Sequence, residues 1–175
     1  VELEDGAGHF QLILGTFHSR IAVYIGKLLY LIVLAVFATI LCVFLFDVLY
    51  PVMPFSFYIK PLIILILAGI PIYLISIFVG FSLGKSVAMG LGIVGSLLSA
   101  LLVTGLGDFI WKFLPWGWGV RFMDYCVLQC VNERQFYSTF HEFQLGFIFM
   151  LIFTVVLFII SLMWFQRWEG GKENE

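Results

Sequence analysis

Charged residues are scarce in this sequence: they make up 11% of its 175 residues, whereas apolar residues make up 62%. A soluble domain needs far more polar surface than this composition supplies. The formal net charge is only -2 and no basic stretch is present, which argues against nucleic acid as a partner. The composition therefore predicts an integral membrane protein.

Sequence patterns for catalysis are also missing. The chain has no Gly-x-Ser-x-Gly motif, no His-Glu-x-x-His motif and no acidic cluster inside an apolar run. Residues 79–86 end in Gly-Lys-Ser, but Val79 stands where a phosphate-binding loop requires glycine. We therefore expect no catalytic residue, no cofactor site and no metal site here, and we expect the energy for any transport to come from another protein.

Cysteine is rare as well, with three residues in the whole chain. Cys42 lies in an apolar run, as a small core residue does. Cys126 and Cys130 are four residues apart, which places both on one face of a helix. A disulfide between them is one alternative and two free thiols the other, and the sequence favours the free thiols.

Long uncharged runs, by contrast, are abundant. About 20 helical residues cross a hydrocarbon core of about 30 Å. Four runs qualify, and they predict an all-α, polytopic membrane bundle. The predicted spans are residues 28–46, 62–84, 86–107 and 145–165.

The connections between these runs have their own signals. Three prolines and several aromatic residues in 49–61 predict a short turn at the membrane interface, and Pro71 predicts a kink in the second span. Residues 108–144 form a predicted outer loop, in which dense tryptophan beside proline and glycine predicts short re-entrant helices and not a fifth crossing. The distribution of basic residues predicts that both ends of the sequence, including the tail 167–175, face the cytoplasm.

The third predicted span carries a small residue at every fourth position. Small residues allow helix backbones to approach closely in lipid, so they predict a helix-packing seam. This seam either joins two helices of this chain, or faces a second subunit or a substrate path. Its residues are Ala88, Gly92, Ser96, Ala100 and Thr104.

Residues 1–27 form the one long segment that is neither a span nor a loop between spans. It opens with acids, continues with apolar residues at helical spacing, and ends with Arg20 and Lys27 just before the first span. Its pattern alone is compatible with a helix lying on the membrane surface or with a helix that docks a partner protein.

The order of residues in this segment resembles the cytoplasmic coupling region of ABC-2 type permeases, the membrane subunits of many bacterial ABC exporters. Two positions depart from the family pattern, since His9 replaces the usual Thr and Phe17 the usual Pro. The resemblance implies six spans, of which this chain supplies the last four. The matching residues are Glu4, Gly8, Phe10, Ile13, Leu14, Ser19, Arg20, Gly26 and Lys27.

The outer loop adds a second resemblance. Its Trp-x-x-x-Pro-Trp pattern, formed by Trp111, Pro115 and Trp116, is similar to a signature of the lantibiotic-immunity permeases. These subunits help a producer strain to expel its own antimicrobial peptide. The resemblance therefore implies a bacterial plasma-membrane protein whose partners are an ABC ATPase subunit carrying ATP and Mg²⁺, a second permease subunit, membrane lipids and the peptide.

In that interpretation, residues 1–27 receive the movement of the ATPase. Two alternatives remain open: an ABC-2 exporter of drugs or lipids, and a stand-alone membrane scaffold or peptide-binding immunity protein. The residues to which the resemblance assigns the coupling role are Glu2, Glu4, Asp5, Gly8, Phe10, Leu14, Phe17, Arg20 and Lys27.

Overall fold

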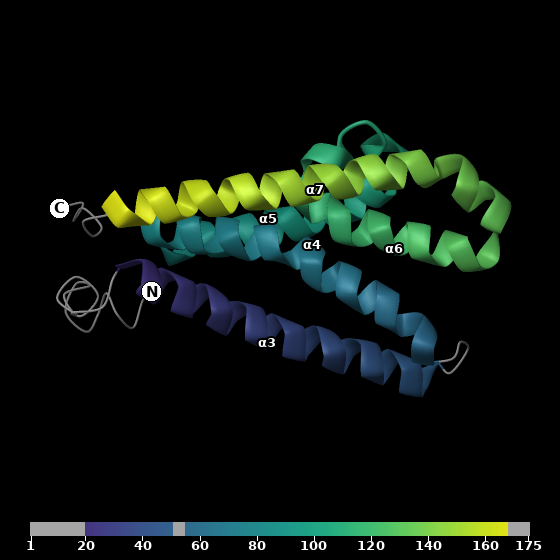
Figure 1. The fold of residues 1–175 in the computed structure, drawn as a ribbon, viewed down its shortest axis with the longest axis horizontal. Helices are drawn as coiled ribbons and strands as arrows, with labels where there is room; N and C mark the ends of the chain where they lie inside the picture. Colours follow the sequence, from purple (N-terminus) through teal and green to yellow (C-terminus); the bar gives the residue numbers. More distant parts are fainter. Residues whose placement is uncertain (1–19, 51–54, 168–175) are drawn as a thin grey trace.

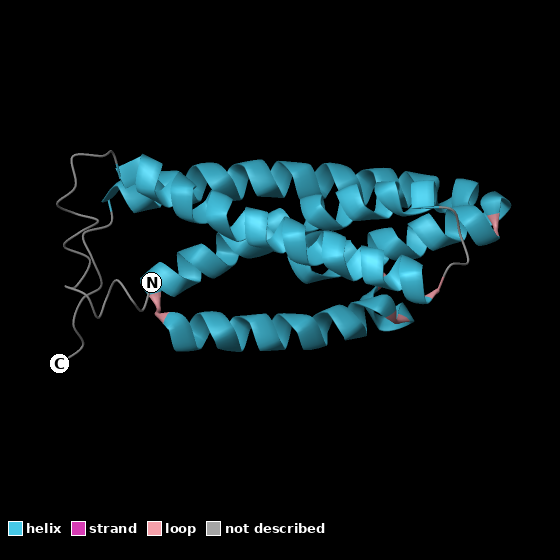
Figure 2. Ribbon diagram, turned by 90° about the horizontal axis from the view of Figure 1, so that it is seen from below, coloured by secondary structure: helices cyan, strands magenta, loops and turns pink. Residues whose placement is uncertain are grey.

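The computed structural model of the chain describes residues 20–50 and 55–167, and all secondary structure in these ranges is helical (Figure 2). Four of the helices are long and apolar enough to cross a membrane, which confirms the predicted all-α membrane class. The elements, in chain order, are α3 (Arg20–Leu49), α4 (Phe55–Ser82), α5 (Lys85–Val103), the 3₁₀ turns η1 (Gly105–Gly107) and η2 (Trp111–Phe113), α6 (Pro115–Val131) and α7 (Glu133–Arg167).

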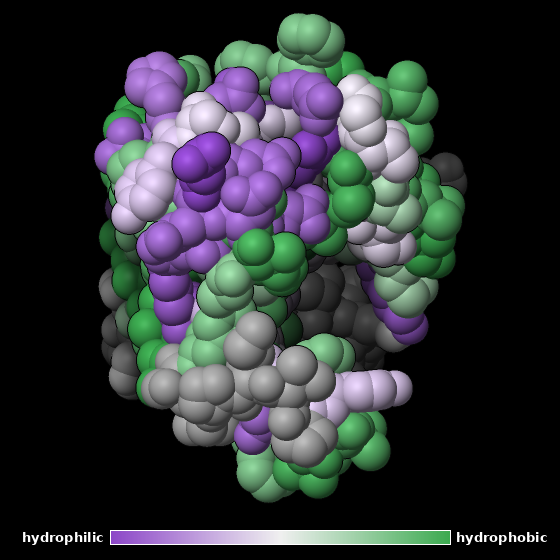
Figure 3. Space-filling model, turned by 90° about the vertical axis from the view of Figure 1, so that its right-hand side faces the viewer, coloured by the Kyte–Doolittle hydropathy of each residue, from purple (hydrophilic) through white to green (hydrophobic). Residues whose placement is uncertain are grey.

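The four long helices run alternately up and down the bundle (Figure 1). We call the end that carries Arg20 and Arg167 the terminal end, and the opposite end, where α6 lies, the α6 end. The central helix is α4, which contacts α3, α5, α6 and α7, whereas α5 lies at one edge against α4 and α6. Hydrophilic side chains gather over the α6–α7 turn when the molecule is viewed from the α6 end (Figure 3).

The second long helix begins earlier than the sequence indicated. α4 starts at Phe55, so Phe57, Tyr58 and Pro61 lie within it and not in the predicted turn 49–61. Pro61 has no N–H to donate to the carbonyl of residue 57, and this helix accommodates the loss of that one bond, as it does at Pro71.

The last long helix also begins earlier, at Glu133, twelve residues before the predicted span at 145. Asn132 explains this start, because its side-chain oxygen accepts a hydrogen bond from the backbone N–H of Gln135 at 3.2 Å. The Asn132 side-chain Nδ2 also donates to Oε1 of Gln135 at 3.3 Å, so Asn132 caps the N-terminus of α7 and is held there by Gln135. The predicted outer loop 108–144 therefore consists largely of α6 and the first turns of α7.

Buried side chains form two separate clusters, one at each end of the bundle. The terminal cluster comprises Tyr24, Leu28, Leu74, Ile77, Phe81 and Phe165. The larger α6 cluster comprises Ile64, Ala68, Leu102, Trp111, Trp118, Phe122, Tyr125, Cys126, Phe136 and Met150. Because α4 and α7 contribute to both clusters, these two helices connect the ends of the molecule.

The outward faces of the long helices are apolar. Phe37 on α3, Leu97 on α5 and Ile159 on α7 are each half exposed or more. Several serine and threonine hydroxyl groups in the spans are satisfied locally, as when Thr39 donates to the carbonyl of Ala35 and Thr154 to that of Met150. Such a surface is unfavourable in water and matches hydrocarbon, which agrees with a membrane-embedded bundle.

Candidate functional site at the α6 end

The tryptophan signature lies at the centre of the α6 end. Trp111, in η2, is almost fully buried, and its ring packs edge-on against Phe122 at a centroid distance of 5.8 Å. Pro115 is the first residue of α6, where its missing N–H has no helical acceptor to lose. A Cβ added at Gly146 of α7 would lie only 2.4 Å from Cη2 of Trp111, so the indole fits a space that only glycine leaves. Trp111 therefore fixes α7 against α6.

A third tryptophan completes this structure. Trp118 is fully buried, donates from Nε1 to the carbonyl of Lys112 at 3.0 Å, and packs edge-on against Phe153 at 5.4 Å. We call residues 111–122 the tryptophan cap. The sequence indicates Trp118 only as part of the dense tryptophan beside Pro115, because its spacing from Pro115 does not show that its indole turns inward.

Arg121 joins the cap to the end of α5. Its Nε donates to the carbonyl of Leu102 at 2.6 Å and its Nη2 to the carbonyl of Thr104 at 3.0 Å, and Nη2 also pairs with Asp108. The last carbonyls of a helix have no partner within the helix, so a guanidinium that binds two of them stabilises the C-terminus of α5. The sequence identified Arg121 only as one basic residue of the outer loop.

A second polar group connects the cap to α7. The Tyr125 hydroxyl donates to Glu142 Oε2 at 3.4 Å, and Glu142 Oε1 lies 3.9 Å from Lys112 Nζ. Burial, together with the negative charge of Glu142, raises the pKa of Tyr125 to about 12. Tyr125 is therefore a neutral hydrogen-bond donor at any physiological pH.

The predicted helix-packing seam is largely exposed in the described part of the chain, and whether it packs within this chain, against a second subunit or along a substrate path stays a prediction. Gly92, Ser96, Ala100 and Thr104 are exposed, and Ala88 is half buried near Gly80 of α4. The closest contact between α5 and the tryptophan cap is at Gly95, one residue before Ser96. A Cβ at the buried Gly95 would lie 1.9 Å from Nε1 of Trp116, so Gly95 is the position at which the cap sits against α5.

A cavity of about 510 Å³ between α4, α5 and α6 brings two predicted features together. Ser96 of the seam and Trp116 of the signature both line it, although they come from different segments. Asp124 of α6 also lines it. Partial burial raises the pKa of Asp124, and the charge of Arg121 opposes this shift. No sequence pattern marks Asp124, which only the folding of α6 against α4 and α5 brings to this cavity.

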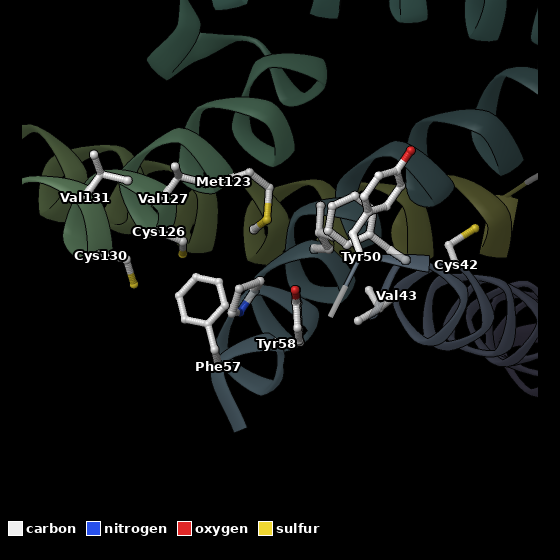
Figure 4. A pocket seen from close by; sticks show the side chains of 13 residues that line it. Cys42, Val43, Tyr50, Phe57, Tyr58, Met123, Cys126, Val127, Cys130 and Val131 are labelled. Atoms are coloured by element: carbon white, nitrogen blue, oxygen red, sulfur yellow. The ribbon is translucent and has the colours of Figure 1, made fainter. Parts of the chain in front are cut away.

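A larger cavity, of about 700 Å³, lies between α3, α4 and α6, and we call it the thiol cavity (Figure 4). All three cysteines of the chain, Cys42, Cys126 and Cys130, line it as free thiols. Burial raises the pKa of Cys126, which therefore stays protonated. The expectation of free thiols at 126 and 130 is confirmed. Within the described ranges, no group of three His, Cys, Asp or Glu side chains is placed to hold a metal ion.

Most of the predicted coupling residues lie outside the described residues, namely Glu2, Glu4, Asp5, Gly8, Phe10, Leu14 and Phe17. Arg20 is the first residue of α3. Lys27 lies in the same helix, with Nζ 4.9 Å from the centroid of the Phe81 ring on α4. The assignment of these residues to coupling stays a prediction.

Comparison with protein families, with curated protein sequences and with solved structures finds no match to this chain.

Proposed function

We propose that the chain is the permease subunit of an ABC-2 type transporter that expels an antimicrobial peptide of the lantibiotic type from the membrane. The tryptophan cap is the observation that carries this proposal. It places short helical elements between the third and the last long helix, and it is built on the residues of the Trp-x-x-x-Pro-Trp signature. This is the element order that the family resemblance implies for the last four spans of a six-span permease.

The helices offer a route for movement from the terminal end to the α6 end. In the proposal, the partner ATPase binds ATP and Mg²⁺ and displaces residues 1–27, which continue into α3. Tyr24 of α3 packs against Phe165 of α7 at a centroid distance of 5.0 Å, and Lys27 lies over Phe81 of α4. Because α4 and α7 extend into the α6 cluster, a tilt of α3 reaches the cap through packed side chains.

The cavity lined by Ser96, Trp116 and Asp124 supports a peptide substrate. Its walls are mainly apolar, and Asp124 supplies one carboxyl group near an indole. Such a lining accepts an apolar side chain and an amino or guanidinium group side by side, which is the chemistry of a cationic, amphipathic peptide. In the proposal, the exposed small-residue face of α5 leads to this cavity.

The test is coupling between peptide and ATP hydrolysis. The chain is produced with its ATPase and permease partners, reconstituted in vesicles, and assayed for ATPase activity with and without peptide. We expect Glu4→Gln combined with Arg20→Gln to abolish stimulation by peptide and to leave membrane insertion intact. Lys172→Gln, a charge change in the tail, is the matched control and should keep full stimulation.

Three results would contradict the proposed function or parts of it. Stimulation that survives in the double variant refutes the coupling role of residues 1–27. If no ATPase co-purifies with the chain, the stand-alone scaffold or immunity protein is the better function. A deletion strain that loses drug resistance and keeps peptide resistance indicates an exporter of drugs or lipids instead.

A further inference from the structure

The peptide proposal has no use for the thiol cavity. Figure 4 shows Cys126 and Cys130 of α6 on one side, with Phe57 and Tyr58 of α4 beside them, and Cys42 and Val43 of α3 on the other side. The lining is almost entirely carbon and sulfur. Its volume of about 700 Å³ is within the range of sites that hold small apolar ligands.

The surroundings of the cavity decide what can fill it. A water molecule in such a space would find too few hydrogen-bond partners, because each buried water needs about two to four. Phe46, Val127 and Val131 line the cavity and are themselves about half exposed or more on the outward faces of α3 and α6. In a bilayer these faces meet acyl chains, so the cavity opens into hydrocarbon.

A positive charge lies next to the cavity. Lys60 precedes the lining residue Pro61 on α4 and lines a separate cavity between α4 and α7, where its Nζ donates to Oε1 of Gln129 on α6. Its positive charge still acts on the thiol of Cys126, which lines the thiol cavity. The amino group also lies 5.9 Å from the centroid of the Phe136 ring. Within residues 20–50 and 55–167, no carboxylate is within ion-pairing distance of Lys60, so its charge can pair with an anionic group from outside the chain.

We propose that the thiol cavity binds a membrane phospholipid, with one acyl chain between α3, α4 and α6 and the phosphate at Lys60. Tyr50 and Tyr58 line the same cavity, and tyrosine is favoured at the level where acyl chains meet headgroups. The apolar walls hold the chain and the lysine selects the phosphate. This inference goes beyond the transporter proposal and does not depend on it.

Photo-crosslinking tests the site. The full chain is reconstituted in phosphatidylcholine nanodiscs with a small fraction of phosphatidylglycerol that carries a diazirine on one acyl chain, and cross-linked peptides are mapped by mass spectrometry. We expect cross-links concentrated on residues 42–50 and 123–131. Val127→Trp fills the cavity and should remove most of them, whereas Val94→Trp, an equally exposed change on α5, should not.

The headgroup is tested separately. Lys60→Gln should lower cross-linking by phosphatidylglycerol about threefold and leave cross-linking by a diazirine diacylglycerol unchanged. Equal loss with both probes would overturn the role of Lys60. If cross-links are as dense on α5 as on the residues that line the cavity, the probe is reporting ordinary surrounding lipid. That result would overturn the proposed phospholipid site.

Native cysteines supply a second measurement if the Val127 variant does not fold. In wild-type protein stripped of lipid, a bilayer-soluble maleimide labels the exposed thiol of Cys130, which lines the cavity. Added phosphatidylglycerol should slow this labelling, because the acyl chain covers Cys130. Labelling at an unchanged rate would contradict the proposal without any substitution.

Discussion

Replacement of Arg121 by methionine tests how strongly its hydrogen bonds hold the cap against the C-terminus of α5. The guanidinium lies over the last turn of α5, with hydrogen bonds to the carbonyls of Leu102 and Thr104. Its side chain is 15% exposed, whereas that of its ion-pair partner Asp108 is 56% exposed. A hydrogen bond from a charged donor contributes about 1.5–3 kcal/mol, so loss of both carbonyl contacts predicts a cost of about 3–5 kcal/mol.

The same structure predicts a much smaller effect at Asp108. Because this carboxylate is largely in solvent, its pair with Arg121 is screened and Asp108→Asn should cost at most about 1 kcal/mol. Arg121→Lys keeps the charge but lacks the planar fork that binds both carbonyls, so its cost should lie between the other two.

Denaturant-induced unfolding in detergent measures these differences, with tryptophan fluorescence of the cap as the signal. The expected order of destabilisation is Arg121→Met, then Arg121→Lys, then Asp108→Asn. The reasoning fails if Asp108→Asn destabilises as much as Arg121→Met, because the ion pair would then be the main interaction. It also fails if Arg121→Met costs less than about 1 kcal/mol.

Two further predictions concern the contacts between the cap and α7. Gly146→Ala places a Cβ against the buried ring of Trp111, which has no room to move, and should cost about 1–3 kcal/mol in the same unfolding assay. Gly26→Ala is the matched control, since nothing lies within 4 Å of its added Cβ, and it should stabilise α3 by about 0.5–1 kcal/mol. The pKa of Tyr125 is raised to about 12 from 10.0, so the unfolded chain ionises first and stability should fall as pH rises from 10.0 towards 12. Tyr125→Phe should abolish this part of the pH dependence, and an unchanged profile would contradict the assignment.

The fold class could be predicted from the sequence because a chain that crosses hydrocarbon must satisfy its backbone hydrogen bonds internally. Long uncharged runs cross a membrane as helices, and the four long helices contain the four predicted spans apart from a few terminal residues of the second and third. The boundaries were harder to predict. Prolines in 49–61 indicated a turn, but in α4 the helix continues through Pro61. The start of α7 could have been predicted, because Asn132 and Gln135 have the spacing of a helix N-terminal cap. The many aromatic residues of this segment favoured an interfacial loop instead.

The site was predictable only in part, for a different physical reason. The signature residues Trp111, Pro115 and Trp116 do organise the α6 end, but a motif cannot tell which partner each ring meets. Spacing by four in the small-residue seam predicts a face of the helix but not what packs against it, and it does not predict the close contact of Gly95 with Trp116. Arg121 and Asp124 depend on contacts with segments distant in sequence. No local pattern encodes such pairings.

The length of α7 has a mechanical consequence. A helix of 35 residues is about 52 Å long, well beyond the roughly 30 Å of hydrocarbon that it has to cross. It packs near one end through Phe165, at Gly146 against the ring of Trp111, and near the other end through Phe136 of the α6 cluster. An uninterrupted helix held in this way acts as a lever with its pivot at Trp111. A tilt of about 5° around that pivot would move the terminal end by about 2–3 Å and swing the Glu133 end the opposite way.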